Sequence, residues 1–263
     1  MTTLEAVILG IVEGFTEFLP ISSTAHLVIT SEILRIPESA FLGSFIIAIQ
    51  LGAIASVVVL YWKTIVLDSE TMKRVFVAFV PTAVIGFLLY QFVKGFLLEN
   101  LFVIAWALLL GGMVLILFEW WQKGISARAL PAQAGTPLST MPYSKAFLVG
   151  VAQALAIIPG VSRAGATILG GLALGLGRAD IVVFSFLLAI PTMLAATGYD
   201  LYKTGSSFAT NEWHLLALGF IVSFIAAYAG VRFLVSFVQT HSFSGFGWYR
   251  IVLGVAVLIY LAL

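Results

Sequence analysis

The sequence predicts an all-α polytopic membrane protein built as an inverted-topology repeat, and three observations support this fold class. The 263 residues are 61% hydrophobic and only 10% charged, and their mean hydropathy of +1.11 is far too high for a soluble domain of this size. Six apolar stretches are long enough, or nearly so, to cross a bilayer as helices. Two polar segments of similar pattern interrupt them. These features predict one integral membrane domain covering residues 1–263.

The expected transmembrane helices come from apolar runs with few charges. They are Phe41–Trp62, Val75–Val93, Leu101–Trp121, Ile181–Tyr199, Leu215–Val238 and Trp248–Leu263. The 24 glycines suit close packing of membrane helices. The absence of cysteine excludes disulfides, thiol catalysis and cysteine-ligated metal. No run of Lys or Arg suggests nucleic acid as a partner.

The first polar segment, EGFTEFLPISSTAH, covers residues 13–26. The stretch Leu4–Phe18 is predicted as a helix that stops at Pro20, and the cluster Ser22–Thr24 can cap a second short helix over Ala25–Leu34. Two short helices that meet at a polar turn predict a re-entrant hairpin. Its irregular backbone must be buried in protein or line a cavity.

The second polar segment, LVGVAQALAIIPGVSRAGATILGG, covers residues 148–171 and repeats the order of helix, break, polar turn and helix. Three pairs of residues share an offset of 140 positions: Gly10 with Gly150, Ser22 with Ser162, and Lys63 with Lys203. We interpret this as an internal repeat rather than a coincidence of pattern. The halves are 1–121 and 145–263, each with one re-entrant hairpin and three spans, joined by a cytoplasmic linker over 122–144. Because three spans is an odd number, the second half enters the membrane from the opposite side.

The distribution of Lys and Arg predicts the orientation. One side has Arg35, Lys94 and Lys203, and the richer side has Lys63, Lys73, Arg74, Lys123, Arg128, Lys145, Arg178 and Arg250. The richer side is expected to be cytoplasmic, which places both termini outside.

An acidic pair in the first segment predicts a metal site. Glu13 and Glu17 are four residues apart and share one face of the predicted helix. Holding two acids at membrane depth costs roughly 5–7 kcal/mol, and their repulsion adds to this unless a proton or a cation lies between them. A divalent cation such as Mg²⁺ or Ca²⁺ binds carboxylates together with phosphate oxygens. The alternative is an interfacial pair hydrated among lipid headgroups.

The turns of both hairpins predict a phosphate site. Each turn opens a helix, and a helix N-terminus presents free N–H groups to an anion. Arg163 adds a guanidinium that can hold phosphate oxygens bidentately, and His26 can act as a general acid or base or orient a serine nucleophile. At the repeat offset Ser23 aligns with Arg163 and Glu13 with Gln153, so one half supplies anions and the other a cation.

At these residues the chain resembles the undecaprenyl-diphosphate phosphatases, also called bacitracin-resistance proteins, nearly from end to end. EGFTEFLPISSTAH is similar to the glutamate-rich signature of that family, and PGVSRAGAT is similar to its P-G-x-S-R-S-x-x-T signature. FLLAIPTMLAATGYDLYK and AIQLGAIASVV are also similar to family segments. One departure is Ala164, where the signature has a second serine.

The resemblance implies hydrolysis of the terminal phosphate of a C55 polyprenyl diphosphate, which yields the monophosphate carrier of cell-wall synthesis. It also implies a divalent cation and a site reached from the outer face of the cytoplasmic membrane. The residues carried over as catalytic are Ser23, His26, Glu17 and Arg163; those for substrate are Ser22, Thr24, Ser162, Arg163 and Thr167; those for metal are Glu13 and Glu17.

Three points stay open in the sequence. Ser23 could attack with His26 or Glu17 taking its proton, or one of these bases could activate water. A lipid-phosphate flippase using the same midplane site is the main alternative, because broken helices in inverted repeats are typical of transporters; a structural scaffold is the third. The partners expected are the lipid and the membrane, and a homodimer is compatible with the sequence.

Overall fold

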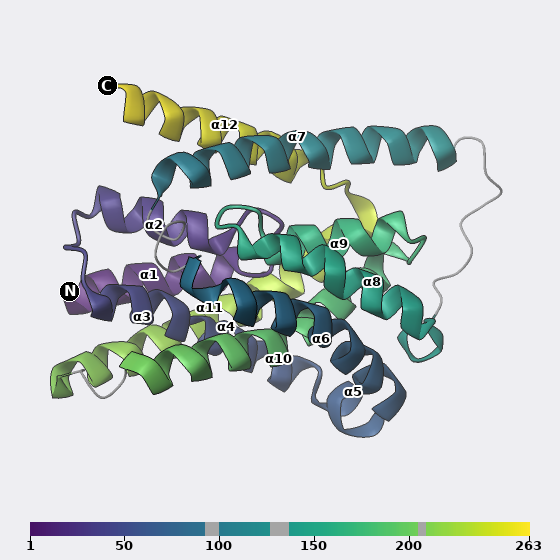
Figure 1. The fold of residues 1–263 in the computed structure, drawn as a ribbon, viewed down its shortest axis with the longest axis horizontal. Helices are drawn as coiled ribbons and strands as arrows, with labels where there is room; N and C mark the ends of the chain where they lie inside the picture. Colours follow the sequence, from purple (N-terminus) through teal and green to yellow (C-terminus); the bar gives the residue numbers. More distant parts are fainter. Residues whose placement is uncertain (93–99, 127–136, 205–208) are drawn as a thin grey trace.

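The computed structural model describes residues 1–92, 100–126, 137–204 and 209–263, and these residues form helices joined by turns (Figure 1). Six of its helical segments are long and apolar enough to cross a membrane. They are α3 with α4 (Ala40–Ala48 and Gln50–Leu60), α6 (Ser69–Phe92), α7 (Leu101–Ser126), α10 (Arg178–Thr204), α11 (Thr210–Thr240) and α12 (Ser244–Ala262). Each predicted span falls on one of these segments. Of the expected linker, residues 127–136 lie outside the described residues.

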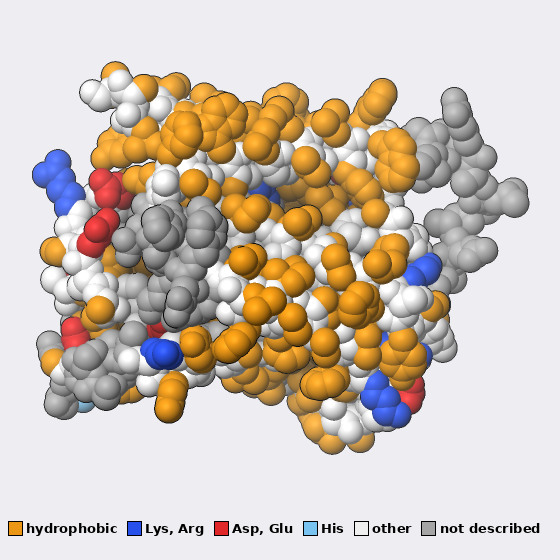
Figure 2. Space-filling model, viewed as in Figure 1, with side chains coloured by type: hydrophobic (Ala, Val, Ile, Leu, Met, Phe, Trp, Pro, Cys, Tyr) orange, Lys and Arg blue, Asp and Glu red, His pale blue; other side chains and the backbone are white. Residues whose placement is uncertain are grey.

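Hydrophobic side chains cover most of the surface along these helices (Figure 2). Several of them are largely exposed, such as Phe87 on α6 at 71% and Trp120 on α7 at 76%. Charged side chains gather toward the two ends of the long axis (Figure 2). An apolar belt between two charged ends is the surface that a lipid bilayer requires. The chain is a multi-pass membrane protein.

Two helical hairpins lie among the spans, as the two polar segments predict. The first consists of α1 (Thr3–Thr16) and α2 (Ser23–Ile33). The second consists of α8 (Tyr143–Ala154), the short 3₁₀ helix η3 (Leu155–Ile157) and α9 (Arg163–Ala173). The hairpins approach from opposite ends of the molecule and their turns meet near its centre, while both termini lie at the end where the first hairpin begins (Figure 1).

Each hairpin packs mainly against a span of the other half of the chain. The helix α1 packs along α11, α8 packs along α6, and α7 packs along α12. Close approach depends on glycine: a side-chain carbon at Gly14 would overlap Ala226, and one at Gly150 would overlap the carbonyl of Ala78. These contacts hold both turns in the interior, away from lipid.

The first span differs from its prediction. The expected helix Phe41–Trp62 is divided into α3 and α4 near Ile49, where the N–H of Gly52 bonds to the carbonyl of Ile49 at 2.9 Å, three residues back. At the same place the backbone of α11 crosses so closely that a side-chain carbon at Gly52 would overlap the carbonyl of Phe220. The break follows from this tertiary contact, which the sequence pattern does not record.

Two arginines counted on the richer side are buried within helices instead of lying at a membrane surface, which corrects the sequence interpretation. Arg74 is on α6, is 8% exposed, and donates to the carbonyl of Met141 at 2.5 Å. Arg250 is on α12 and is 1% exposed. Both guanidinium groups bond to backbone carbonyls, which replace the water that a loop would provide.

Candidate active site

The turns of the two hairpins have the same local structure. Ser22 and Ser162 have φ of 72° and 74°, in the left-handed region that non-glycine residues seldom adopt. Each is the N-cap of the following helix: the Ser22 hydroxyl accepts the N–H of Ala25 at 3.4 Å, and the Ser162 hydroxyl accepts that of Gly165 at 3.1 Å. The cap predicted in the Ser22–Thr24 cluster is confirmed, and the structure adds the one at Ser162. Ser23 and Arg163 are therefore the first residues of α2 and α9.

Arg250 joins the two turns, and sequence reasoning missed this role. Its guanidinium donates to five backbone carbonyls of three segments: Pro20 (3.2 Å) in the first turn, Gly160 (2.9 Å) and Val161 (2.9 Å) in the second, and Ala107 (2.9 Å) and Leu108 (3.4 Å) on α7. A signal was present, since Arg250 is a charge within a predicted span, and such residues are rare without a partner or a function. Its position brings the two turns together.

The closest polar contact between the hairpins is an ion pair. Arg163 bonds to one carboxylate oxygen of Glu17 through Nη2 at 3.0 Å and Nε at 3.3 Å, and both side chains are less than 10% exposed. The other oxygen of Glu17 accepts the hydroxyl of Ser23 at 2.5 Å. Arg163 Nη1 donates to the carbonyl of Ser185 on α10 at 2.9 Å. Glu17 thus connects two groups: the serine hydroxyl, whose proton it can take, and a guanidinium that can bind phosphate.

Glu13 lies one helical turn before Glu17 and is fully buried. Neither of its carboxylate oxygens has a hydrogen-bond partner among the described residues. The buried hydroxyls of Ser185 and Ser223 likewise have none, and Ser223 is on α11 where that helix crosses Gly14. An unpaired buried carboxylate is unfavourable by several kcal/mol, and a proton or a hard cation bound through oxygen would remove that cost at Glu13. The described residues contain no cluster of three or more His, Asp or Glu, so the protein would offer Glu13 and Glu17 as its carboxylates.

His26 is hydrogen-bonded to Ser22 and Tyr249. Its Nδ1 is 2.7 Å from the carbonyl of Ser22, which can only accept, so Nδ1 carries the proton. In the neutral ring Nε2 is then the acceptor, and it lies 2.7 Å from the hydroxyl of Tyr249 on α12. The two rings stack with centroids 5.5 Å apart. Tyr249 is a second residue that sequence reasoning missed, and nothing in its local sequence signals the contact.

Thr167 and Gln153 of the second hairpin are hydrogen-bonded to each other and to residues of two spans. Thr167 is fully buried and donates to Gln153, whose amide nitrogen bonds to Thr82 on α6 and Thr192 on α10, each at 3.1 Å. Gln153 aligns with Glu13 in the repeat. The same position therefore has a carboxylate without a hydrogen-bond partner in one half and a hydrogen-bonded amide in the other. Thr24 is partly exposed in the first turn of α2. The structure thus gathers Glu13, Glu17, Ser22, Ser23, Ser162 and Arg163 around the two turns.

The sequence was also compared with known proteins. The family model of the bacitracin resistance protein BacA matches residues 6–256. Undecaprenyl-diphosphatase of Aquifex aeolicus is 50% identical over 97% of this chain and 96% of its own length. The protein of the same name from Sulfurihydrogenibium sp. is 49% identical over 97% of this chain and 98% of its own length, and that from Thermus thermophilus is 45% identical over 95% and 94%. The chain belongs to the BacA family of bacitracin-resistance proteins.

Proposed function

We propose that this chain is a membrane phosphatase that hydrolyses undecaprenyl diphosphate to the monophosphate and inorganic phosphate. The relatives described above carry the name undecaprenyl-diphosphatase. The product is the lipid carrier that cell-wall synthesis uses again. None of these relatives is named as a transporter, and no contact in the site favours the flippase alternative.

The observation that carries this proposal is the 2.5 Å bond from the Ser23 hydroxyl to Glu17, whose other oxygen binds Arg163. In the proposed reaction the Ser23 oxygen attacks the terminal phosphorus and its proton passes to Glu17. The bond between that phosphorus and the bridging oxygen breaks, and undecaprenyl monophosphate leaves. Water then hydrolyses the phosphoserine and releases inorganic phosphate. Arg163 and the N–H groups that open α2 and α9 stabilise the charge on the transferred group.

Between the two candidate bases, the geometry favours Glu17. Both ring nitrogens of His26 are within 2.7 Å of groups other than Ser23, namely the carbonyl of Ser22 and the hydroxyl of Tyr249. We therefore propose that Glu17 takes the proton of Ser23 in the reaction. His26 exchanges a proton with the leaving monophosphate or with the attacking water.

We further propose that Glu13 and Glu17 hold a divalent cation such as Mg²⁺ or Ca²⁺. The unpaired carboxylate of Glu13 is the supporting observation. When bound, the cation would neutralise charge on the phosphate and complete its coordination with phosphate oxygens and water.

The inverted repeat is also proposed on the basis of packing. Gly10 and Gly150, which align in the repeat, occupy matching contacts: Gly10 lies against Gly219 on α11, and Gly150 lies against Ala78 on α6. Each hairpin packs against a span of the other half, which is the two-fold pattern that such a repeat requires. Basic residues of the richer side lie on elements at the end opposite the termini (Figure 1): Lys63 on α5 (Trp62–Leu67), Lys73 and Arg74 at the start of α6, Lys145 at the start of α8, and Arg178 at the start of α10. That end is proposed to be cytoplasmic, with the termini, and access to the site, on the outer side of the cytoplasmic membrane.

Release of inorganic phosphate from undecaprenyl diphosphate by the purified protein tests the function. We expect release that depends on a divalent cation, a loss of at least 100-fold in Ser23→Ala and Arg163→Ala, and no change in Arg232→Ala, which alters an exposed arginine of α11. Mass spectrometry of rapidly quenched samples should detect phosphate on Ser23. No release by the parent protein with any divalent cation would refute the proposal, and lipid movement without release would favour the transporter.

A further inference from the structure

A lateral groove lies between α2 and α12, with the start of α7 as its floor. Its volume is about 430 Å³, which is in the range of ligand clefts. Its apolar lining comes from Ile29, Ile33, Leu101, Leu253, Ala256 and Val257. Glu32, Arg35 and Tyr260 line it near the last turns of the two helices, where Tyr260 donates to Glu32 at 3.2 Å. We call this cavity the α2–α12 groove.

The His26–Tyr249 pair lies one helical turn inward of the residues that line the α2–α12 groove. His26 lies about one helical turn before Ile29 on α2, and Tyr249 lies one turn before Leu253 on α12. The 2.7 Å bond and the stacked rings therefore separate the groove from the turn at Ser22. A single pair of side chains connects the apolar groove to the polar site.

This pair is also the exposed flank of the site. Glu13 is fully buried, Glu17 and Ser23 are 5% and 7% exposed, and the Arg163 side chain is 8% exposed. Tyr249 is exposed on the lipid-facing side of α12, and His26 is half-buried beside it. The exposed Tyr249 and the half-buried His26 therefore offer a path for a substrate that is held at Arg163 and Ser23.

We propose that the α2–α12 groove binds the polyprenyl chain of the substrate, with the isoprene units nearest the diphosphate beside Tyr249. The inference rests on the proposed phosphatase function and locates its lipid subsite. An apolar chain suits the groove because its middle is lined by aliphatic side chains and its charged residues lie at the outer end, at the level expected for lipid headgroups. The diphosphate is drawn inward by Arg163 and the two helix N-termini.

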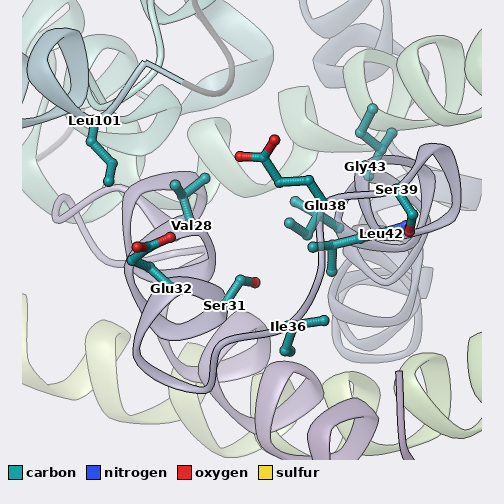
Figure 3. Close-up of a pocket in the computed structure, with 11 residues that line it drawn as sticks. Val28, Ser31, Glu32, Ile36, Glu38, Ser39, Leu42, Gly43 and Leu101 are labelled. Atoms are coloured by element: carbon teal, nitrogen blue, oxygen red, sulfur yellow. The ribbon is translucent and has the colours of Figure 1, made fainter.

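Two other cavities are less suited to the polyprenyl chain. The cavity between α6 and α10 has the same volume, but it meets the interior at Thr82 and Thr192, which are engaged with Gln153 rather than with a catalytic residue. The cavity between α2 and α3 is about 120 Å³ and presents Glu32, Glu38 and the hydroxyl of Ser31 (Figure 3). An apolar chain there would lie against Glu38 and the Ser31 hydroxyl, which the α2–α12 groove does not contain, and would leave them without water or another partner.

The test compares two diphosphates that differ in chain length. Ala256 lies seven residues beyond Tyr249, roughly 10 Å along α12, so undecaprenyl diphosphate passes it and the single isoprene unit of dimethylallyl diphosphate does not reach it. Ala256→Trp should lower kcat/KM for the long substrate at least tenfold and change the short one less than threefold. The matched control is Ala195→Trp, an exposed alanine of the α6–α10 cavity, which should change neither.

The absence of native cysteine allows a second measurement that does not depend on a bulky residue. Undecaprenyl monophosphate should slow maleimide labelling of Ala256→Cys at least fivefold and leave labelling of Ala195→Cys unchanged. Protection at Ala195→Cys instead, or equal loss of both substrates in Ala256→Trp without protection at Ala256→Cys, would overturn the groove assignment. A parent protein that hydrolyses neither diphosphate would instead refute the proposed function.

Discussion

Ser22 and Ser162 lie 140 positions apart in the chain and have nearly the same backbone conformation, with φ of 72° and 74°. Each hydroxyl caps the helix that follows, and Arg250 bonds to carbonyls of both turns. The two turns are thus equivalent in structure although their neighbours differ in charge: Ser23 follows one, and Arg163 follows the other. This equivalence brings a hydroxyl and a guanidinium to the same carboxylate.

The conformation of Ser162 predicts an unusual order of stability for two substitutions. Ser162→Ala loses the cap, at a cost of about 1 kcal/mol, and keeps a side chain at positive φ. Ser162→Gly loses only a few tenths for the cap and relieves about 1 kcal/mol of strain. Thermal unfolding in detergent should therefore show the glycine variant to be more stable than the alanine variant.

The control for this order is Ser236, an exposed residue inside α11. There glycine should be less stable than alanine by about 1 kcal/mol. The same order at both positions would argue against strain at Ser162.

Arg250 should be essential to the fold because its guanidinium satisfies five buried carbonyls. Arg250→Met removes these bonds and should lower the free energy of unfolding by about 3 kcal/mol or more. Arg232→Met, at an exposed position of α11, should change it by less than about 0.5 kcal/mol. Equal unfolding temperatures for the two variants would contradict this role.

Divalent cation should change the unfolding temperature of the protein through Glu13, and this can be measured without an activity assay. Without cation, Glu13→Gln should unfold at a higher temperature than the parent, because it removes a buried acid that must otherwise take up a proton or stay unpaired. Added Mg²⁺ or Ca²⁺ should stabilise the parent by mass action and the variant much less. Glu38→Gln, at an exposed position, serves as the control and should behave as the parent does. A cation-induced shift of the same size in Glu13→Gln would remove Glu13 from the metal site.

Tyr249 should act as a positioning residue for His26. Tyr249→Phe keeps the stacked ring and removes one hydrogen bond to Nε2, so kcat should fall about tenfold with KM nearly unchanged. Tyr143→Phe removes a comparable hydroxyl bond, to Glu70 and outside the groove, and should leave kcat unchanged. A rise in KM with constant kcat in Tyr249→Phe would assign the hydroxyl to binding instead.

Local sequence was enough to predict the spans and hairpins of this protein, but not the division of the first span into α3 and α4. Apolar length located all six spans, because a bilayer requires about 20 apolar residues per helix. Proline and the Ser22–Thr24 cluster located the first turn, because proline stops a helix and serine caps one. The acidic pair and Arg163 stood out because charge at membrane depth is costly without a purpose.

What the sequence by itself determined was therefore the class of the protein, its helices and most of its polar residues. Only the tertiary structure decided which polar groups meet: Glu17 with Arg163 and Ser23, His26 with Tyr249, and Arg250 with both turns. These contacts join residues up to 230 positions apart. The physical reason is that capping, periodicity and hydropathy act over a few neighbouring residues, whereas the packing of hairpins against distant spans sets the distances between their turns.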